Sequence, residues 1–312
     1  MERAEMEIFL TLSEELHFGR TAERLHVTTG LVSKTVKKIE RRLGVALFER
    51  TSRHVALTPV GHGLREDLVP LYEGIKRALD RAEMAGRGMH GTLTVGFMGT
   101  QASRFLYAAR EVFEQRNPHC DVRVIETQLH HHATQLRDGS ADLLLITLPV
   151  DEPDMTMGAV ITRSERYISL PVNHRLAGRA EVSMEDLAGE TFIGVPESVP
   201  RYWSDLHLPE RTPADRPIRR RPEPCTTYAE ALGQVSAGRA VVPGDGQLPL
   251  LYQRPDIHFA RITDAPPIEH GLVWRACDDT DQRVRAFADA VLEISPALAP
   301  PGTSAVERRV PG

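Results

Sequence analysis

The side chains best suited to chemistry in this chain are basic ones that gather near its N-terminus. Residues 20–53 contain nine Lys or Arg against three Asp or Glu, a net charge of +6. Positive charge at that density attracts a polyanion such as nucleic acid. A solvated helix face with paired charges is the alternative interpretation. The formal charge of −5 for all 312 residues hides this block, because the remainder of the chain is acidic.

A helix-turn-helix pattern positions the basic block. Residues 20–25 are expected to form a short helix, with the small residue Ala22 where a second helix must approach closely. Thr28 is a suitable N-cap for a longer helix over residues 29–43, which Gly44 would end. The apolar residues of this longer helix recur at helical spacing and are expected to form its buried stripe: Val32, Val36, Ile39 and Leu43.

Such a motif reads base edges with the N-terminal end of its second helix, and basic residues further along lie near phosphates. Residues 47–51 and 54–58 are expected to form two short strands, a wing. Arg53 lies at its tip, and a guanidinium is favoured in a narrow minor groove. The side chains expected to bind DNA are Thr28, Thr29, Ser33, Lys34, Lys37, Lys38 and Arg53.

A long helix is expected to follow, with Thr58 as its N-cap and Pro59 in its first turn. Apolar residues recur along it at the spacing of a coiled coil, which predicts pairing of two chains. Pro70 lies inside this pattern and is expected to kink the helix. A partner within the same chain is the alternative. The expected dimerisation residues are Leu64, Leu68, Leu71, Ile75 and Leu79.

From residue 91 onward, strand patterns alternate with helical ones, which is typical of an α/β fold. Ligands of such folds sit beyond the carboxyl ends of the strands, near helix N-termini. Each polar residue at such a position could equally serve as a helix cap. The tail over residues 297–312 is rich in Pro and Gly and is expected to be disordered. The candidate effector-binding residues are Thr100, Gln101, Ser103, Gln128, Thr147, Ser198, Thr226 and Thr227.

Several motifs resemble those of LysR-type transcriptional regulators. The strongest resemblance covers about 60 N-terminal residues without gaps, and a looser one continues through the C-terminal part. The N-terminal motifs are Ser13–Phe18, Thr21–Val27, Leu43–Arg50 and Leu57–Gly61. The C-terminal motifs are Leu93–Phe97, Gly139–Asp142, His174–Ala177, Asp186–Gly189 and Val235–Gly238.

The resemblance implies an α+β multidomain protein: a winged helix-turn-helix over 1–58, a linker helix over 59–88 and an α/β effector domain over 89–296. That domain would hold two Rossmann-like subdomains, one over about 91–161 and 268–296, the other over about 162–267. The implied partners are double-stranded promoter DNA, a small-molecule effector of unknown identity and other copies in a homodimer or homotetramer. RNA polymerase is a further candidate partner. A cytoplasmic protein that neither acts as an enzyme nor needs a cofactor, a metal or a membrane is expected.

Two departures from the family pattern affect specificity. Thr29-Gly30 stands where the family most often has Gln-Pro, and Lys34 stands where it usually has Arg, so the preferred bases are expected to differ. Relatives that bind aromatic acids often carry an Arg near the position of Thr147. Its absence makes a carboxylate ligand less favoured, although Arg104 could substitute.

Other chemistries fit the sequence less well. Three consecutive histidines, His130 to His132, point in different directions on a helix and are not expected to share a metal ion. Cys120, Cys225 and Cys277 are far apart and are expected to be free thiols. A solute-binding or enzymatic α/β protein with an N-terminal dimerisation module remains an alternative, as does a regulator that responds to no ligand.

Overall fold

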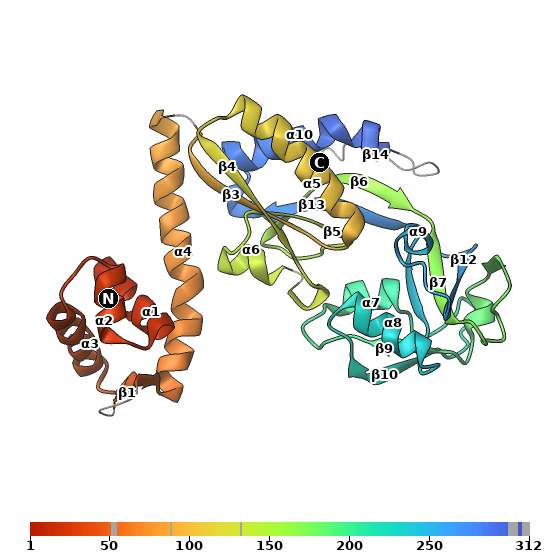
Figure 1. The fold of residues 1–312 in the computed structure, drawn as a ribbon, viewed down its shortest axis with the longest axis horizontal. Coiled ribbons are helices and arrows are strands. Elements are labelled where there is room, and N and C mark those ends of the chain that lie inside the picture. The colour runs from red at the N-terminus through yellow and green to blue at the C-terminus, as the bar shows by residue number, and fades with distance from the viewer. Residues whose placement is uncertain (51–54, 88, 132, 299–304, 308–312) are drawn as a thin grey trace. The chain divides into compact units, whose positions relative to one another are not determined.

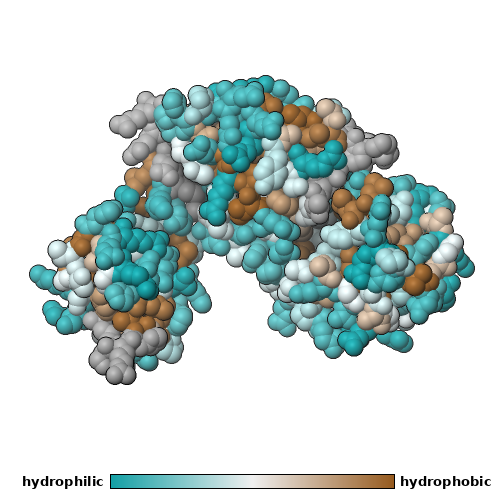
Figure 2. Space-filling view, in the orientation of Figure 1, coloured by the Kyte–Doolittle hydropathy of each residue, from teal (hydrophilic) through white to brown (hydrophobic). Residues whose placement is uncertain are grey.

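The computed structural model describes residues 1–50, 55–87, 89–131, 133–298 and 305–307. The chain divides into two compact units, Met1–Gly86 and Arg87–Gly312, and each has its own hydrophobic core (Figure 1). Within the described residues, no helix is long and apolar enough to cross a membrane. Figure 2 shows a mainly hydrophilic visible face with scattered apolar areas, as expected for surfaces that face water.

The N-terminal unit is a winged helix-turn-helix followed by a long helix. The turn before helix α3 is fixed by Thr28, whose hydroxyl accepts a hydrogen bond from Leu31 N at 3.2 Å. Gly44 ends α3 with a φ of 71°. The unit comprises α1 (Arg3–Glu15), α2 (Phe18–Arg24), α3 (Thr29–Leu43), the antiparallel strands β1 (Phe48–Arg50) and β2 (Val55–Leu57), and α4 (Pro59–Arg87). The predicted motif and wing strands are confirmed, whereas Arg53 lies outside the described residues.

The core of this unit explains why α3 is held against the other helices. Val32, Val36 and Ile39 are fully buried, as predicted, but Leu43 is 47% exposed because it lies at the end of the helix. The first turns of α4 belong to the same core. Gly61 permits this, since a Cβ there would lie 2.2 Å from the carbonyl oxygen of Leu47.

The packing of helix α4 differs in part from the predicted dimerisation residues. Leu68 is buried and Leu64 half-buried in the core of their own chain, so the intrachain alternative holds for this pair. Leu71, Ile75 and Leu79 remain exposed. The helix continues through Pro70.

The first lobe of the C-terminal unit, lobe I, is built on a six-stranded sheet of order β14-β6-β13-β5-β3-β4. Strands β3 (Gly91–Phe97), β4 (Cys120–Glu126) and β5 (Leu143–Thr147) are parallel, while β13 (Ile268–Arg275) and β6 (Met155–Ser164) add antiparallel strands. Helices α5 (Thr100–Arg116) and α10 (Gln282–Leu298) pack together beside the sheet (Figure 1). Phe113 and Phe287 join them, with ring centroids 5.6 Å apart.

The second lobe, lobe II, begins where the chain leaves β6 and ends where it returns to β13. Its main sheet has the order β11-β7-β12-β8, beside a parallel pair of β9 and β10. The chain passes between the lobes at Glu165 and again between Ile262 and Ile268. The elements of lobe II are β7 (Arg166–Pro171), β8 (Glu181–Val182), β9 (Thr191–Gly194), α7 (Arg201–His207), β10 (Arg219–Pro224), α8 (Tyr228–Ser236), β11 (Val242–Asp245), α9 (Leu248–Leu251) and β12 (Ile257–Ile262).

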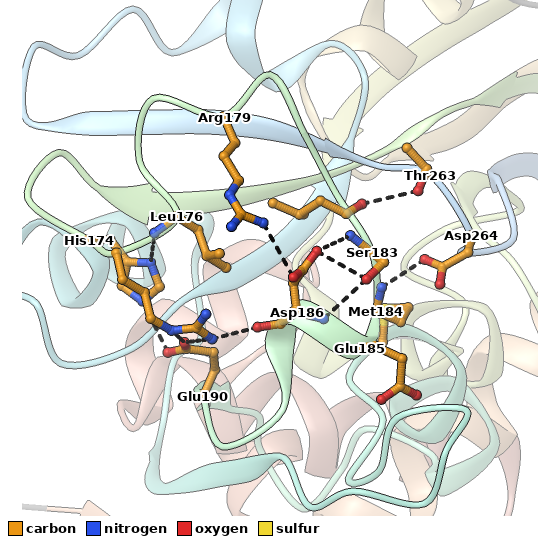
Figure 3. A network of polar contacts seen from close by, with 12 residues as sticks. His174, Leu176, Arg179, Ser183, Met184, Glu185, Asp186, Glu190, Thr263 and Asp264 are labelled. Atoms are coloured by element: carbon orange, nitrogen blue, oxygen red, sulfur yellow. Dashed lines mark hydrogen bonds and ion pairs between the residues drawn. The ribbon is translucent and has the colours of Figure 1, made fainter.

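The motifs of lobe II that carried the family resemblance stabilise its turns. Asp186 accepts hydrogen bonds from Ser183 N and Oγ at 2.9 and 3.0 Å and pairs with Arg179 (Figure 3). Glu190 lies 3.1 Å from His174 Nε2. These side chains satisfy one another, so this cluster holds loops in place and is not a site for a ligand.

Three sequence expectations differ from the structure. In place of the helix expected around the three histidines, the structure has a 3₁₀ turn, Leu129–His131, and the short α6, Thr134–Asp138. The expected disorder from residue 297 is wrong in part, because α10 continues to Leu298. Residues Ala305–Glu307 form β14, which pairs with the otherwise open edge of β6. The strand β6 and the short helix α7 were not expected at all.

Candidate DNA-binding surface and ligand cavity

Three basic side chains on the outer face of α3 have no acidic partner among the residues that the structure describes. Lys34, Lys37 and Arg41 are exposed and follow one another at spacings of three and four residues, which places them on one face. None of them forms an ion pair within the described part of the chain. Thr29 is exposed and Ser33 half-buried near the N-terminal end of this face. This arrangement fits phosphate contacts beside base contacts.

Acidic residues of α1 neutralise most of the other basic side chains. Glu5 lies 2.7 Å from Lys38 and 3.3 Å from Arg42, and the Lys38 ammonium lowers the pKa of this carboxyl to about 2. Glu15 pairs in the same way with Arg20 and Arg24. Lys38, which was expected near the phosphates, is therefore directed toward α1. Arg41 was not predicted, although its spacing from Lys34 and Lys37 could have indicated it.

Both lobes of the C-terminal unit line one cavity of about 450 Å³. That size suits a small molecule. Of the predicted effector-binding residues, Gln128 and Thr147 of lobe I and Thr226 and Thr227 of lobe II line this cavity. Thr227 also forms a capping box with Glu230, so it has the structural role that was the alternative.

Two other predicted effector-binding residues, Ser103 and Ser198, do not line the cavity. Ser198 donates a hydrogen bond to the carbonyl oxygen of His130 at 3.0 Å, and neither it nor Ser103 is part of the wall. Thr100 and Gln101 begin α5, and their side chains lie outside what the structure describes. Arg104, considered as a substitute cation, is exposed and absent from the described wall.

Sequence reasoning missed several polar residues of the wall, among them Arg166, His207, Asp245 and His270. Arg166 and Asp245 stand at the ends of strands that border the lobe crossing, and His207 ends the unexpected helix α7. Their sequence neighbours give no motif. Only the strand ends could have pointed to Asp245, because it is the last residue of β11.

His270 is buried in β13, beside the strand β6 that leads into lobe II. Its Nδ1 lies 3.3 Å from Thr162 Oγ1, and its Nε2 lies 3.8 Å from Asp245 Oδ2. Burial lowers the pKa of His270, and the carboxylate of Asp245 opposes this only partly. The ring is therefore neutral near pH 7.

The two buried thiols, of Cys120 and Cys225, are poorly suited to redox chemistry. Cys225 lines the cavity and Cys120 lies in the core of lobe I, so the two are in separate clusters. Burial raises the pKa of Cys120 to about 11 and also raises that of Cys225. A thiol that stays protonated is a poor nucleophile toward oxidants. Cys277 is exposed, and all three cysteines are free.

The chain joins a winged helix-turn-helix with exposed cations to a two-lobed domain with a ligand-sized cavity. This combination defines a DNA-binding regulator that responds to a small molecule. Residues 4–62 match the "Bacterial regulatory helix-turn-helix protein, lysR family" and residues 86–295 match the "LysR substrate binding domain". The chain belongs to the LysR family of bacterial transcription regulators.

Full-length relatives agree with this assignment. The chain is 30% identical to the DNA-binding transcriptional dual regulator OxyR of Escherichia coli K12, over 93% of this chain and 95% of the relative. It is 28% identical to the regulator AlsR of Bacillus subtilis 168, over 90% and 97%. The crystal structure of CbnR, a LysR family regulator, has the same fold, with a TM-score of 0.64 and 22% identity over 95% of this chain and 99% of that one.

Proposed function

We propose that this regulator contacts promoter DNA through Thr29, Ser33, Lys34, Lys37 and Arg53. The observation that carries this proposal is the exposed face of α3, where Lys34 and Lys37 have no acidic partner among the described residues. Lysine is a single-point donor, so Lys34 contributes to base choice less strictly than a forked arginine would. Thr28 acts mainly as the helix cap.

The test is a titration of the full-length protein against operator DNA recovered from sheared genomic DNA by in vitro selection. Lys34→Ala and Arg53→Ala should each weaken binding by about 1–3 kcal/mol. Loss of a phosphate contact at Lys37 should lower the slope of log K against log salt by about one. Lys76→Ala serves as the control, because Lys76 is an exposed lysine paired with Glu73 on α4. Undiminished affinity in both Lys34→Ala and Arg53→Ala contradicts the assignment.

We further propose that an effector in the cavity changes DNA binding by linkage. A ligand that fits one arrangement of the two lobes better shifts the population toward it, and the oligomer then holds its DNA-binding units differently. A change in half-site spacing or DNA bend follows. A promoter footprint that stays the same for every compound that binds the cavity would refute this linkage, and would favour a regulator that responds to no ligand.

The regulator acts in the cytoplasm in this proposal, because its target is chromosomal DNA. It binds its effector and does not convert it. Regulation through a redox-active cysteine pair is not part of this proposal, because Cys120 and Cys225 lie in separate cores and burial raises the pKa of both thiols.

A further inference from the structure

Arg166 is a buried cation in the cavity wall with no carboxylate partner in the described part of the chain. It is 3% exposed, and all its contacts are to uncharged acceptors. Nε donates to Pro266 O at 3.1 Å, one terminal nitrogen donates to Leu206 O at 3.1 Å and His207 O at 3.4 Å, and the other lies 3.3 Å from His207 Nδ1. Buried arginines are usually paired with acids. A guanidinium has five N–H groups, so one remains unused here.

His207 cannot supply the missing charge. Its Nε2 lies 2.7 Å from the carbonyl oxygen of Leu148, which only accepts, so this nitrogen carries a hydrogen. Its Nδ1 faces the guanidinium of Arg166, which only donates. The ring is therefore a neutral acceptor, and the positive charge of Arg166 remains uncompensated.

Asp245 brings a carboxylate to the same cavity wall without pairing with Arg166. Asp245 is the register partner of Arg166 across the antiparallel β7–β11 ladder, and both residues line the cavity. Opposite charges at such positions normally attract. Here no ion pair joins them. Asp245 Oδ1 accepts from Gln247 N at 2.9 Å, and Oδ2 faces the neutral His270 at 3.8 Å. Among the described residues, the one group that could pair with Asp245 is His270, whose pKa is lowered by burial.

The remaining wall is largely apolar, with one unsatisfied hydroxyl. Ile193, Val195, Trp203 and Leu248 supply hydrocarbon and aromatic surface from lobe II. On lobe I, Thr127 is 1% exposed and lines the cavity, and its hydroxyl has no hydrogen-bond partner among the described residues. A buried polar atom without a partner costs free energy, which a ligand bridging the lobes would recover.

Resting on the proposed role of this cavity, we propose that the effector is a zwitterionic amino acid with an apolar side chain. Its carboxylate binds Arg166, its ammonium group binds Asp245, and its side chain lies against the apolar wall. An anion alone would face Asp245 without a partner, and a cation alone would be repelled by Arg166.

The experiment measures binding of matched compound triplets to the full-length protein by calorimetry and thermal shift. Each triplet contains an amino acid, its deaminated acid and its decarboxylated amine, for example L-phenylalanine, 3-phenylpropanoate and 2-phenylethylamine. The other triplets are built on L-valine, L-leucine, L-isoleucine, L-methionine, L-tyrosine and L-tryptophan. At least one amino acid should bind about ten-fold or more tightly than its acid and its amine, because each lacks one charge partner. No binding by any amino acid, or equal binding by an acid, overturns the proposal.

A variant locates the ammonium contact. Asp245→Asn keeps the acceptor for Gln247 N but removes the charge, so it should weaken the amino acid about ten-fold or more and leave the matching acid no weaker. Asp289→Asn, exposed on α10, is the matched control.

If Asp245→Asn fails to fold, the compound triplets still test the proposal without any variant. If a compound of another class binds and alters operator affinity, the zwitterion proposal fails alone. If operator affinity stays the same with every compound that binds, the proposed linkage is contradicted instead.

Discussion

Nε2 of His207 lies 2.7 Å from the carbonyl oxygen of Leu148, and this hydrogen bond joins the two lobes of the C-terminal unit. His207 ends α7 in lobe II, and Leu148 follows β5 in lobe I. One turn earlier on the same helix, Trp203 Nε1 donates to Thr147 O at 3.3 Å. Helix α7 therefore contacts the backbone of lobe I twice, directly beside the cavity. Any opening of the lobes must break both hydrogen bonds.

Removing the imidazole should destabilise the C-terminal unit. His207→Phe leaves the carbonyl of Leu148 without its donor and one N–H of Arg166 without its acceptor, both in a buried setting. Each unsatisfied group costs about 1–3 kcal/mol, so the free energy of unfolding should fall by about 2–6 kcal/mol in urea titrations. Trp203→Phe loses a single hydrogen bond and should cost about 1 kcal/mol. A His207→Phe variant as stable as the wild type would contradict the joining role of this side chain.

The ion pair between Glu5 and Lys38 should make the N-terminal unit sensitive to acid. Hydrogen bonding to Lys38 lowers the pKa of Glu5 from 4.5 to about 2. Because the folded pKa is depressed, the stabilisation is present above pH 4.5 and is lost as the pH falls toward 2. The melting temperature of the wild type should therefore exceed that of Glu5→Gln at pH 6, and the difference should shrink below pH 4.5.

A second variant separates this ion pair from a general effect of charge on α1. Glu7 is exposed on the same helix, and Glu7→Gln should leave the melting temperature at pH 6 unchanged. A difference between wild type and Glu5→Gln that stayed constant from pH 6 to pH 2.5 would show that Lys38 does not hold the ionised carboxyl.

Local signals in the sequence predicted most elements, because caps and periodic apolar residues act within one helix or strand. Thr28 and Gly44 delimit α3 to the residue, as expected. The strand β6 gave no such signal, since Met155–Ser164 lacks the alternation of a half-buried strand. It is a strand because it lies between β13 and β14, which is a property of the sheet.

The sequence predicted where the cavity lies but not which charged residues line it. Gln128 and Thr147 follow parallel strands, and such strand ends meet at one edge, so both line the cavity. Arg166 and Asp245 come together because β7 and β11 pair, and those strands are 70 residues or more apart in the sequence. Long-range pairing of this kind leaves no local pattern. Lys38 illustrates the same limit, because its partner Glu5 lies on another helix.

The thiols should differ strongly in reactivity. Cys277 is exposed, whereas Cys120 is buried with its pKa raised to about 11, and burial also raises the pKa of Cys225. Iodoacetamide at pH 7.5 should therefore modify Cys277 first, and mass spectrometry of peptides can follow the order. In Cys277→Ser the fast phase should disappear. Rapid modification of Cys120 in the folded protein would mean that the core of lobe I opens readily.

Helix α4 should divide into a part that stabilises its own chain and a part that binds another copy. Leu68 lies in the core of the N-terminal unit, so Leu68→Ala should cost about 2–5 kcal/mol of unfolding free energy.

Leu71 is 62% exposed and Ile75 39% exposed in the single chain, and a partner helix would cover both side chains. Leu71→Glu with Ile75→Glu should therefore lower the mass measured by sedimentation from oligomer to monomer while the helix content is kept. Glu66→Gln, exposed at the start of the same helix, serves as the control. An unchanged mass would place the oligomer interface elsewhere, because two buried carboxylates cannot persist in an apolar seam.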